Sequence, residues 1–318
     1  RVSDATVNAA AAAAAEASDS VAAGAPLISL DHVTVEFGRG KNRFRAVDDV
    51  SLTINKGSIY GIIGFSGAGK STLVRTMNVL QRPTSGTVTF NGTTISTLGE
   101  GRLLPLRRKI AMIFQHFNLM PSRTVLDNVT LPLIHEKVSR KDARAKAMHL
   151  LELVGIADKA KAYPRQLSGG QQQRVAIARA LITKPSLVFA DEPTGNLDSV
   201  SSAEVLSFLK RSVKELGQTV IMVTHDAVAA SYADRAIVFA DGQIVADEQR
   251  PTAESMNQLL MNERERATQL VGGPSAGTTV PRPPVAALKG HTEKASFVPG
   301  APSVPGAPQH AAVAQHRR

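Results

Sequence analysis

An apolar segment at residues 58–63 runs without a break into a glycine-rich loop that ends in lysine and serine. The loop consists of Gly64, Phe65, Ser66, Gly67, Ala68, Gly69, Lys70 and Ser71. Glycines at this spacing let backbone N–H groups converge on phosphate oxygens, and a helix that starts after the loop adds the positive end of its dipole. The pattern therefore predicts a buried strand, a phosphate-binding loop and a helix, which is an α/β arrangement.

The polar residues at the end of this loop are the candidates for contacting phosphate and Mg²⁺. We expect Lys70 to neutralise the β- and γ-phosphates of a nucleotide, the Ser71 hydroxyl to ligate Mg²⁺, and Thr72 to support the α-phosphate. So short a pattern also matches ordinary loops by chance. The prediction therefore depends on the motifs that follow.

A second motif is an apolar segment, residues 187–190, that ends abruptly in Asp191 and Glu192. Core packing does not require two carboxylates at this point. We expect Asp191 to complete the Mg²⁺ shell and Glu192 to polarise the attacking water. The alternative is a strand that merely stops at the protein surface.

A third motif, Leu167 followed by Ser168, Gly169, Gly170 and Gln171, stands directly before a predicted helix. Glycines at a helix start expose unpaired N–H groups at the positive end of the dipole, which favours an anion. The alternative is a glycine turn with a serine cap. Since the chain already has a phosphate loop, a second anion-binding site suggests that two chains share each nucleotide.

The order of these motifs, together with Gln115, the segment 196–198 and His225, resembles the ATP-binding subunit of ATP-binding-cassette (ABC) transporters. The resemblance covers residues 27 to about 250. It implies an α/β P-loop NTPase fold with a mostly parallel core sheet, an antiparallel β subdomain, and a helical subdomain at about 116–167.

The resemblance also implies an ATPase that uses ATP and Mg²⁺ and works as a head-to-tail homodimer. Each ATP would lie between one copy's phosphate loop and the other copy's Ser168–Gln171 segment. Gln115 would contact Mg²⁺ and water, Asp198 would couple the two sites, and His225 would contact the γ-phosphate. The dimer would drive two membrane permease subunits, together with an extracytoplasmic solute-binding protein in an importer, from the cytoplasmic face of the cell membrane.

Phe37 is the candidate platform for the adenine ring, because an aromatic face stacks on a purine. Phe44 is the alternative platform. A third interpretation is that these rings simply belong to the core.

The kind of transporter depends on which half of the chain is compared. Residues 67–75 and 114–129 are similar to methionine-importer ATPases, which favours amino-acid import. Residues 191–198 and 223–235 are more similar to ATPases of lipoprotein-release, macrolide-efflux and cell-division systems. Both interpretations stay open at this point, and the second includes a mechanical ATPase that moves no solute.

The chain ends differ in composition from residues 27–270, which we expect to form the ATPase domain. Residues 1–26 are rich in alanine and residues 271–318 in proline and glycine, so both are predicted to be disordered tails. A secretory signal is the competing interpretation of residues 1–26. The sequence has no cysteine, which excludes disulfides and cysteine-based zinc sites. Its apolar stretches are too short to span a bilayer.

The formal net charge of +10 raises a third function class, a nucleic-acid ATPase. Ordinary solvated basic faces are the favoured explanation of the charge, and we expect no nucleic-acid partner. Alternation and turn residues predict strands at 27–37, 50–54, 58–63, 87–90, 93–95, 109–114, 187–190 and 219–224, and a last strand pair that turns at residues 241–242. Helices are predicted from residue 139, at 168–183 and at 203–216.

Overall fold

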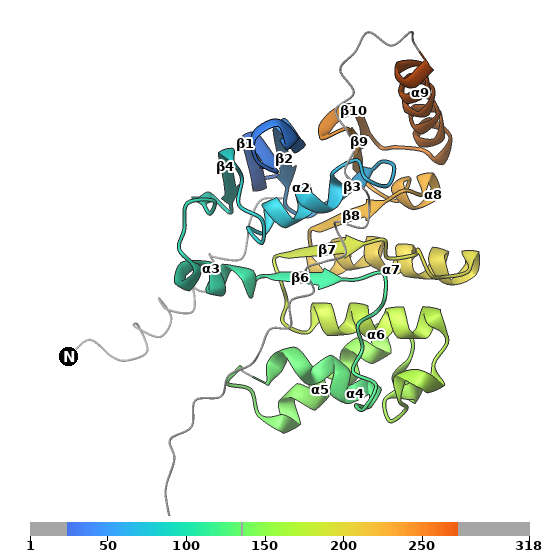
Figure 1. The fold of residues 1–318 in the computed structure, drawn as a ribbon. Helices are drawn as coiled ribbons and strands as arrows, with labels where there is room; N and C mark the ends of the chain where they lie inside the picture. Colours follow the sequence, from blue (N-terminus) through green and yellow to red (C-terminus); the bar gives the residue numbers. More distant parts are fainter. Residues whose placement is uncertain (1–23, 135, 273–318) are drawn as a thin grey trace, which may run out of the picture. The chain divides into compact units, whose positions relative to one another are not determined.

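The computed structural model describes residues 24–134 and 136–272 (Figure 1). The two predicted tails therefore lie almost entirely outside the described residues. The remainder forms one compact unit that contains all the predicted motifs.

The smaller of two sheets is antiparallel, with strand order β2-β1-β4-β5. Its strands are β1 (Pro26–Phe37), β2 (Phe44–Asn55), β4 (Ser85–Phe90) and β5 (Thr93–Thr94). Asn91 and Gly92 both have positive φ, 48° and 77°, as the predicted tight turn between β4 and β5 requires. Strand β2 starts six residues before the predicted strand, because its first residues pair with the end of β1.

The larger sheet has the order β10-β9-β3-β8-β7-β6, and neighbouring strands from β9 to β6 are parallel. Its strands are β3 (Ile59–Ile63), β6 (Ile110–Ile113), β7 (Leu187–Asp191), β8 (Val220–Thr224), β9 (Arg235–Ala240) and β10 (Gln243–Gln249). The mostly parallel core sheet is thus confirmed, with β10 as an antiparallel edge strand.

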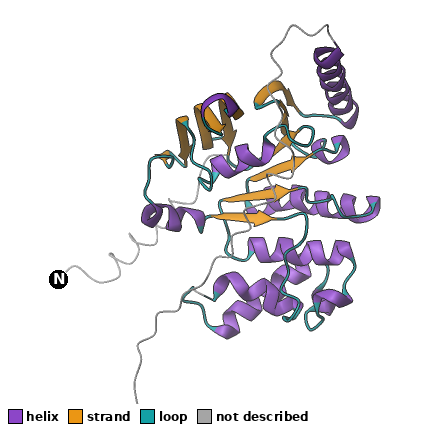
Figure 2. Ribbon diagram, in the orientation of Figure 1, coloured by secondary structure: helices purple, strands orange, loops and turns teal. Residues whose placement is uncertain are grey.

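Helices cover both faces of this sheet (Figure 2). The α-helices are α2 (Lys70–Met77), α3 (Glu100–Arg107), α4 (Val125–Thr130), α5 (Arg140–Leu153), α6 (Gly169–Leu181), α7 (Ser199–Leu216), α8 (Ala227–Ala230) and α9 (Ala253–Gly272). Short 3₁₀ turns are η1 (Gly40–Asn42), η2 (Leu131–Leu133), η3 (Ala157–Lys159) and η4 (Pro164–Gln166).

The helix predictions differ from the structure mainly at the ends. Ser139 caps α5 by accepting a hydrogen bond from the backbone N–H of Asp142, as predicted. Helix α7 starts four residues earlier than predicted because Asp198 caps it. Helix α9 was not predicted, and it continues two residues past the expected domain end at Leu270.

Alternate residues of the central strands enter two different cores. Phe189 packs with Leu73 and Met77 of α2 and with the antiparallel sheet. Val188, the preceding residue, packs with α6 and α7 on the other face, because successive strand side chains point to opposite faces. Burial on both faces leaves the loops at the strand ends as the place for polar chemistry.

Candidate nucleotide site

The sheet order brings the predicted site residues together. Strands β3, β8, β7 and β6 are consecutive neighbours and run parallel, so their carboxyl ends meet at one edge. The residues that follow these ends are the phosphate loop, His225, the pair Asp191 and Glu192, and Gln115. These motifs are up to 161 residues apart in the sequence but share this edge.

The phosphate loop is held close to neighbouring backbone. A Cβ atom at Gly64 would lie 2.1 Å from the carbonyl oxygen of Phe239, and one at Gly69 would lie 2.1 Å from that of Ala46. Gly69 also has φ +103° and precedes α2 without a side-chain cap. No side chain fits at either position, so the loop can follow this path only with glycine there.

The polar residues of the loop divide into one buried group and several accessible ones. Lys70 is buried, and its Nζ donates to the carbonyl oxygens of Gly64 at 2.6 Å and Phe65 at 2.9 Å. Burial lowers the pKa of Lys70, while Glu192 and Asp191 act in the opposite direction. The accessible candidates are Ser66, Gly67 and Ser71, which are exposed, and Thr72, which is half-buried, whereas Ala68 is buried.

Glu192 is held by residues at the end of the neighbouring strand β8. Its Oε1 lies 2.8 Å from His225 Nδ1, and its Oε2 accepts a hydrogen bond from Thr224 Oγ1 at 3.3 Å. The backbone of Glu192 has φ +48°, which is uncommon for a residue with a Cβ and marks a constrained position. The side chain is therefore fixed in direction at the edge of the sheet.

Asp191 differs from its neighbour. Burial raises the pKa of its carboxyl group, the adjacent Glu192 raises it further, and Lys70 and Arg75 lower it. No hydrogen bond or ion pair of its side chain is found in the described part of the chain. A half-buried carboxylate without a donor suits a cation ligand, since hard cations prefer oxygen atoms.

Gln115 is tied to the loop that follows β7. Its carbonyl oxygen accepts a hydrogen bond from Asn196 Nδ2 at 2.8 Å, and a Cβ at Gly195 would lie 2.8 Å from its Nε2. Sequence reasoning identified Gln115 but did not predict Asn196 or Thr224 as site residues. Their hydrogen bonds to partners 81 and 32 residues away depend on the strand order, which no local pattern reveals.

The third motif forms a complete helix start. Ser168 Oγ accepts from the N–H of Gln171 at 3.3 Å, and Gln171 Oε1 accepts from the N–H of Ser168 at 3.1 Å, which is a capping box. Gly169 and Gly170 open the first turn of α6. Asp198 similarly caps α7 by accepting from the N–H of Ser201 at 2.9 Å, and this hydrogen bond lowers the pKa of its carboxyl group.

The Ser168–Gln171 segment is separate from the phosphate loop in a single chain. No hydrogen bond or ion pair joins the two within residues 24–134 and 136–272. Helix α2, which follows the phosphate loop, packs in the core on one face of the sheet, and α6 packs in the core on the other face. The roles predicted for this segment and for Asp198 across a dimer remain predictions.

Phe37 lies at the end of β1 and stacks on Phe44, with ring centroids 5.6 Å apart and an angle of 29°. Phe37 is half-buried against the core and Phe44 is exposed. Ala46, two residues after Phe44, touches the phosphate loop at Gly69. Both candidate adenine platforms therefore lie beside the loop, and the choice between them remains open.

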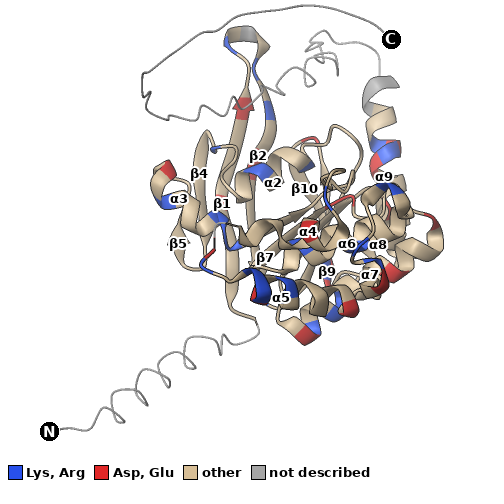
Figure 3. Ribbon diagram, turned by 90° about the horizontal axis from the view of Figure 1, so that it is seen from below, with Lys and Arg blue, Asp and Glu red and all other residues tan. Residues whose placement is uncertain are grey.

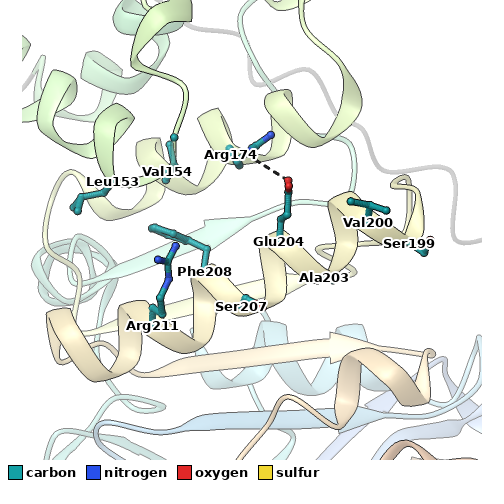
Figure 4. Close-up of a pocket in the computed structure, with 11 residues that line it drawn as sticks. Leu153, Val154, Arg174, Ser199, Val200, Ala203, Glu204, Ser207, Phe208 and Arg211 are labelled. Atoms are coloured by element: carbon teal, nitrogen blue, oxygen red, sulfur yellow. Dashed lines mark ion pairs between the residues drawn. The ribbon is translucent and has the colours of Figure 1, made fainter.

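A hollow of about 690 Å³ lies elsewhere, between α6, α7 and the end of α5 (Figure 4). Its walls include Val154, Val200 and Phe208, and an ion pair between Arg174 and Glu204 crosses it. None of the predicted nucleotide residues lines it. The residues predicted to bind the nucleotide lie instead at the carboxyl ends of the parallel strands.

Two features together define the class of protein as an ABC ATPase. One is a phosphate loop with two carboxylates at the same sheet edge, and the other is a serine-capped, glycine-rich start on a different helix. The chain belongs to the ABC transporter family of ATP-binding proteins. The model of the family described as "ABC transporter" matches residues 47–195.

Known relatives agree with this assignment. The chain is 50% identical over 229 residues to methionine import ATP-binding protein MetN 1 of Lactiplantibacillus plantarum, covering 72% of this chain and 64% of that protein. It is 49% identical to MetN of Bifidobacterium longum, covering 78% and 63%. It is 46% identical to MetN 2 of Rhodococcus jostii, covering 77% and 75%. The chain thus spans slightly less than two thirds of the first two relatives.

Solved structures show the same fold. A dimeric, post-hydrolysis structure of the ATP-binding cassette MJ0796 bound to ADP and Pi has a TM-score of 0.65 at 38% identity, covering 70% of this chain and 99% of that one. CbiO1 of Clostridium perfringens, part of the ABC transporter complex cbiONQ, has a TM-score of 0.67 at 26% identity, covering 77% and 98%. The P-loop fold predicted from the sequence is confirmed.

Proposed function

We propose that this chain is the ATP-hydrolysing subunit of an ABC importer for methionine. Methionine is proposed as the transported substrate because the chain is 46–50% identical to three methionine import ATP-binding proteins. Those three names also favour import over the lipoprotein-release, efflux and cell-division systems that the second half of the sequence resembles.

The geometry supports separate roles for the residues at the sheet edge in binding ATP and in activating water. The loop from Gly64 to Ser71 and Thr72 binds the triphosphate of the substrate ATP. Glu192, oriented by Thr224 and His225, accepts a proton from the attacking water. His225 is exposed and so is also available to the γ-phosphate.

Ser71, Gln115 and Asp191 supply hydroxyl, amide and carboxylate oxygens, which is the donor set that Mg²⁺ prefers. The Asp191 carboxylate, which accepts no hydrogen bond from any residue that the structure describes, supports this assignment. When bound, Mg²⁺ would neutralise charge on the phosphate oxygens.

Two copies are needed for a complete site in this proposal. The Ser168–Gln171 segment offers a capped helix start but lies apart from its own phosphate loop, so it is available to a nucleotide held by a second copy. The dimeric cassette structures that the chain resembles support a pair of copies, and the head-to-tail arrangement is part of the proposal.

The membrane partners follow from the family. No helix in the described part of the chain has both the length and the apolar character to cross a bilayer. We infer peripheral attachment at the cytoplasmic face through two permease subunits, with a solute-binding protein outside. Acidic residues are mixed with the basic ones on α5, which carries Asp142 and Glu152 beside four Lys and Arg, and Glu and Arg alternate at residues 263–266 of α9 (Figure 3). This mixture supports solvated faces rather than a nucleic-acid surface.

The test is reconstitution of the full-length chain with the permease encoded beside its gene. Methionine, presented with the binding protein, is expected to stimulate ATP hydrolysis, and D-alanine is the matched negative control. Stimulation by a lipoprotein or a macrolide, without a response to methionine, would replace import by the alternative. ATP hydrolysis that no solute changes would favour a mechanical role.

A further inference from the structure

Gln173 is a fully buried polar residue in the second turn of α6. Its side chain has 0% exposure, and its Nε2 donates a hydrogen bond to the carbonyl oxygen of Pro193 at 2.8 Å. Pro193 directly follows Glu192 in the chain. One hydrogen bond therefore links the helix that starts at Ser168 to the peptide unit after the proposed general base.

The other end of the Gln173 amide has no hydrogen-bond partner among residues 24–134 and 136–272. Its Oε1 is buried and receives no hydrogen bond in the described part of the chain. An acceptor buried in this way is unfavourable, and an apolar residue of the same size would avoid the loss. Packing alone thus gives no reason for glutamine here, whereas the donor to Pro193 does.

The segment that Gln173 holds is constrained on both sides of Glu192. The Glu192 N–H donates to the carbonyl of Val223 at 2.8 Å, and the Gly195 N–H donates to the carbonyl of Glu192 at 3.0 Å. Glu192 has φ +48°. Pro193 is bonded directly to Glu192, and the backbone of Glu192 is held by hydrogen bonds at both its N–H and its carbonyl group. A shift of Pro193 would therefore change the direction of the Glu192 side chain.

Helix α6 contacts the rest of this segment along its first two turns. A Cβ at Gly170 would lie 2.7 Å from Ser201 Oγ, and one at Gly169 would lie 3.4 Å from a side-chain carbon of Leu197. Arg174 also pairs with Glu204 at 3.5 Å (Figure 4). The start of α6 and residues 192–204 thus pack as one unit, in which Gln173 makes the contact nearest to Glu192.

We propose that Gln173 is a positioning residue that couples the helix start at Ser168 to Glu192 of the same chain. In a head-to-tail dimer, a nucleotide held by the partner's phosphate loop would contact Ser168, and the α6–Pro193 hydrogen bond would set the orientation of Glu192 in this chain's own site. Each site would therefore become competent when the other is filled. The inference rests on the proposed function, specifically on Glu192 as general base and on the shared nucleotide.

The test uses Gln173→Met in the full-length chain, which removes the donor and the unpartnered acceptor at similar volume. We expect kcat for ATP to fall about 10- to 100-fold, as small displacements of catalytic groups do. The affinity of one chain for ATP should stay within about 2-fold, because the phosphate loop is untouched. The Hill coefficient for ATP should fall towards 1.

Gln218→Met is the matched control. Gln218 is also buried, its Oε1 also lacks a partner in the described part of the chain, and its Nε2 contacts the carbonyl of Leu216. It lies just before β8, at the end of the sheet opposite to the nucleotide edge. Both variants should shift the thermal midpoint by less than about 4 °C. A Gln173→Met protein with wild-type kcat and Hill coefficient would overturn the proposal.

A double-mutant cycle with Glu192→Gln separates this proposal from the proposed function. If Gln173 acts through Glu192, Gln173→Met should not lower single-turnover hydrolysis further in the Glu192→Gln background. An equal further loss there would show that Gln173 acts independently and would refute the coupling. Unchanged hydrolysis in Glu192→Gln alone would instead refute Glu192 as the base.

A second variant covers the case in which Gln173→Met does not fold. Gln173→Asn keeps the amide but shortens it by one methylene, so the donor no longer reaches Pro193. We expect the same loss of kcat with retained ATP affinity. Wild-type kcat in this variant would count against the proposal.

Discussion

Glu192 Oε1 and His225 Nδ1 lie 2.8 Å apart although 33 residues separate them in the sequence. Strands β7 and β8 are parallel neighbours, so the residues that follow them meet at one edge. The pair fixes the direction of the carboxylate before any substrate arrives. Pre-orientation of this kind is what a general base needs, because the water it activates must lie in line with the phosphate.

Replacing Glu192 by glutamine keeps the hydrogen-bonding shape and removes the proton acceptor. We expect steady-state ATP hydrolysis to fall about 10²- to 10⁴-fold, with ATP binding retained and dimers trapped with ATP. Phosphate release and gel filtration with ATP would measure this. The control is Glu152→Gln, an exposed position on α5, which should hydrolyse ATP like the wild type.

The Phe37 and Phe44 pair provides a test of adenine recognition. Stacking on one aromatic ring changes affinity for a base by about 1–3 kcal/mol, so Phe37→Ala should weaken ATP binding by about 5- to 150-fold. Phe44→Ala removes the ring that stacks on Phe37 and should have a smaller effect. Fluorescent ATP titrations would rank the two, and the reverse order would assign the platform to Phe44.

The sequence was most informative where function depends on local chemistry. The phosphate loop, the capped start at Ser168 and the carboxylates at the end of β7 are each continuous segments, so spacing and residue type were enough to predict them. Their meeting at one edge followed from the general behaviour of parallel strands.

Contacts between distant segments could not be predicted in the same way. Asn196 holds Gln115, and Gln173 holds Pro193, but glutamine and asparagine are common in loops and helices. Nothing in a single sequence marks which of them is buried. Helix α9 was also missed, since Met256 and Leu260 are the only buried residues within 253–269, where burial is described, and its apolar pattern is correspondingly weak.

Asp198 gives a prediction about pH. Hydrogen bonds from Ser201 hold the pKa of this carboxyl group below its usual value of 3.8. A depressed folded-state pKa stabilises the protein above the unfolded-state value, and this contribution disappears as pH falls through the lower, folded value. Asp198→Asn should therefore reduce the loss of stability on acidification below about pH 4, measured by denaturant unfolding across pH. Ser201→Ala keeps the backbone N–H donor and removes the hydroxyl donor, so it should shift the Asp198 titration upward in NMR by only part of the depression. An unchanged titration would contradict a contribution from the Ser201 hydroxyl.

Gly69 gives a prediction about the phosphate loop itself. Its φ of +103° and the 2.1 Å approach of a Cβ to the Ala46 carbonyl mean that Gly69→Ala must distort the loop or push β2 away. We expect a loss of more than about 2 kcal/mol in unfolding free energy, together with loss of ATP binding. Gly155→Ala is the matched control, because Gly155 also has positive φ, +70°, but nothing lies within 4 Å of its Cβ position. That variant should lose about 1 kcal/mol and bind ATP normally. Equal losses in the two variants would show that backbone conformation alone, and not the close approach to Ala46, excludes a side chain from the loop.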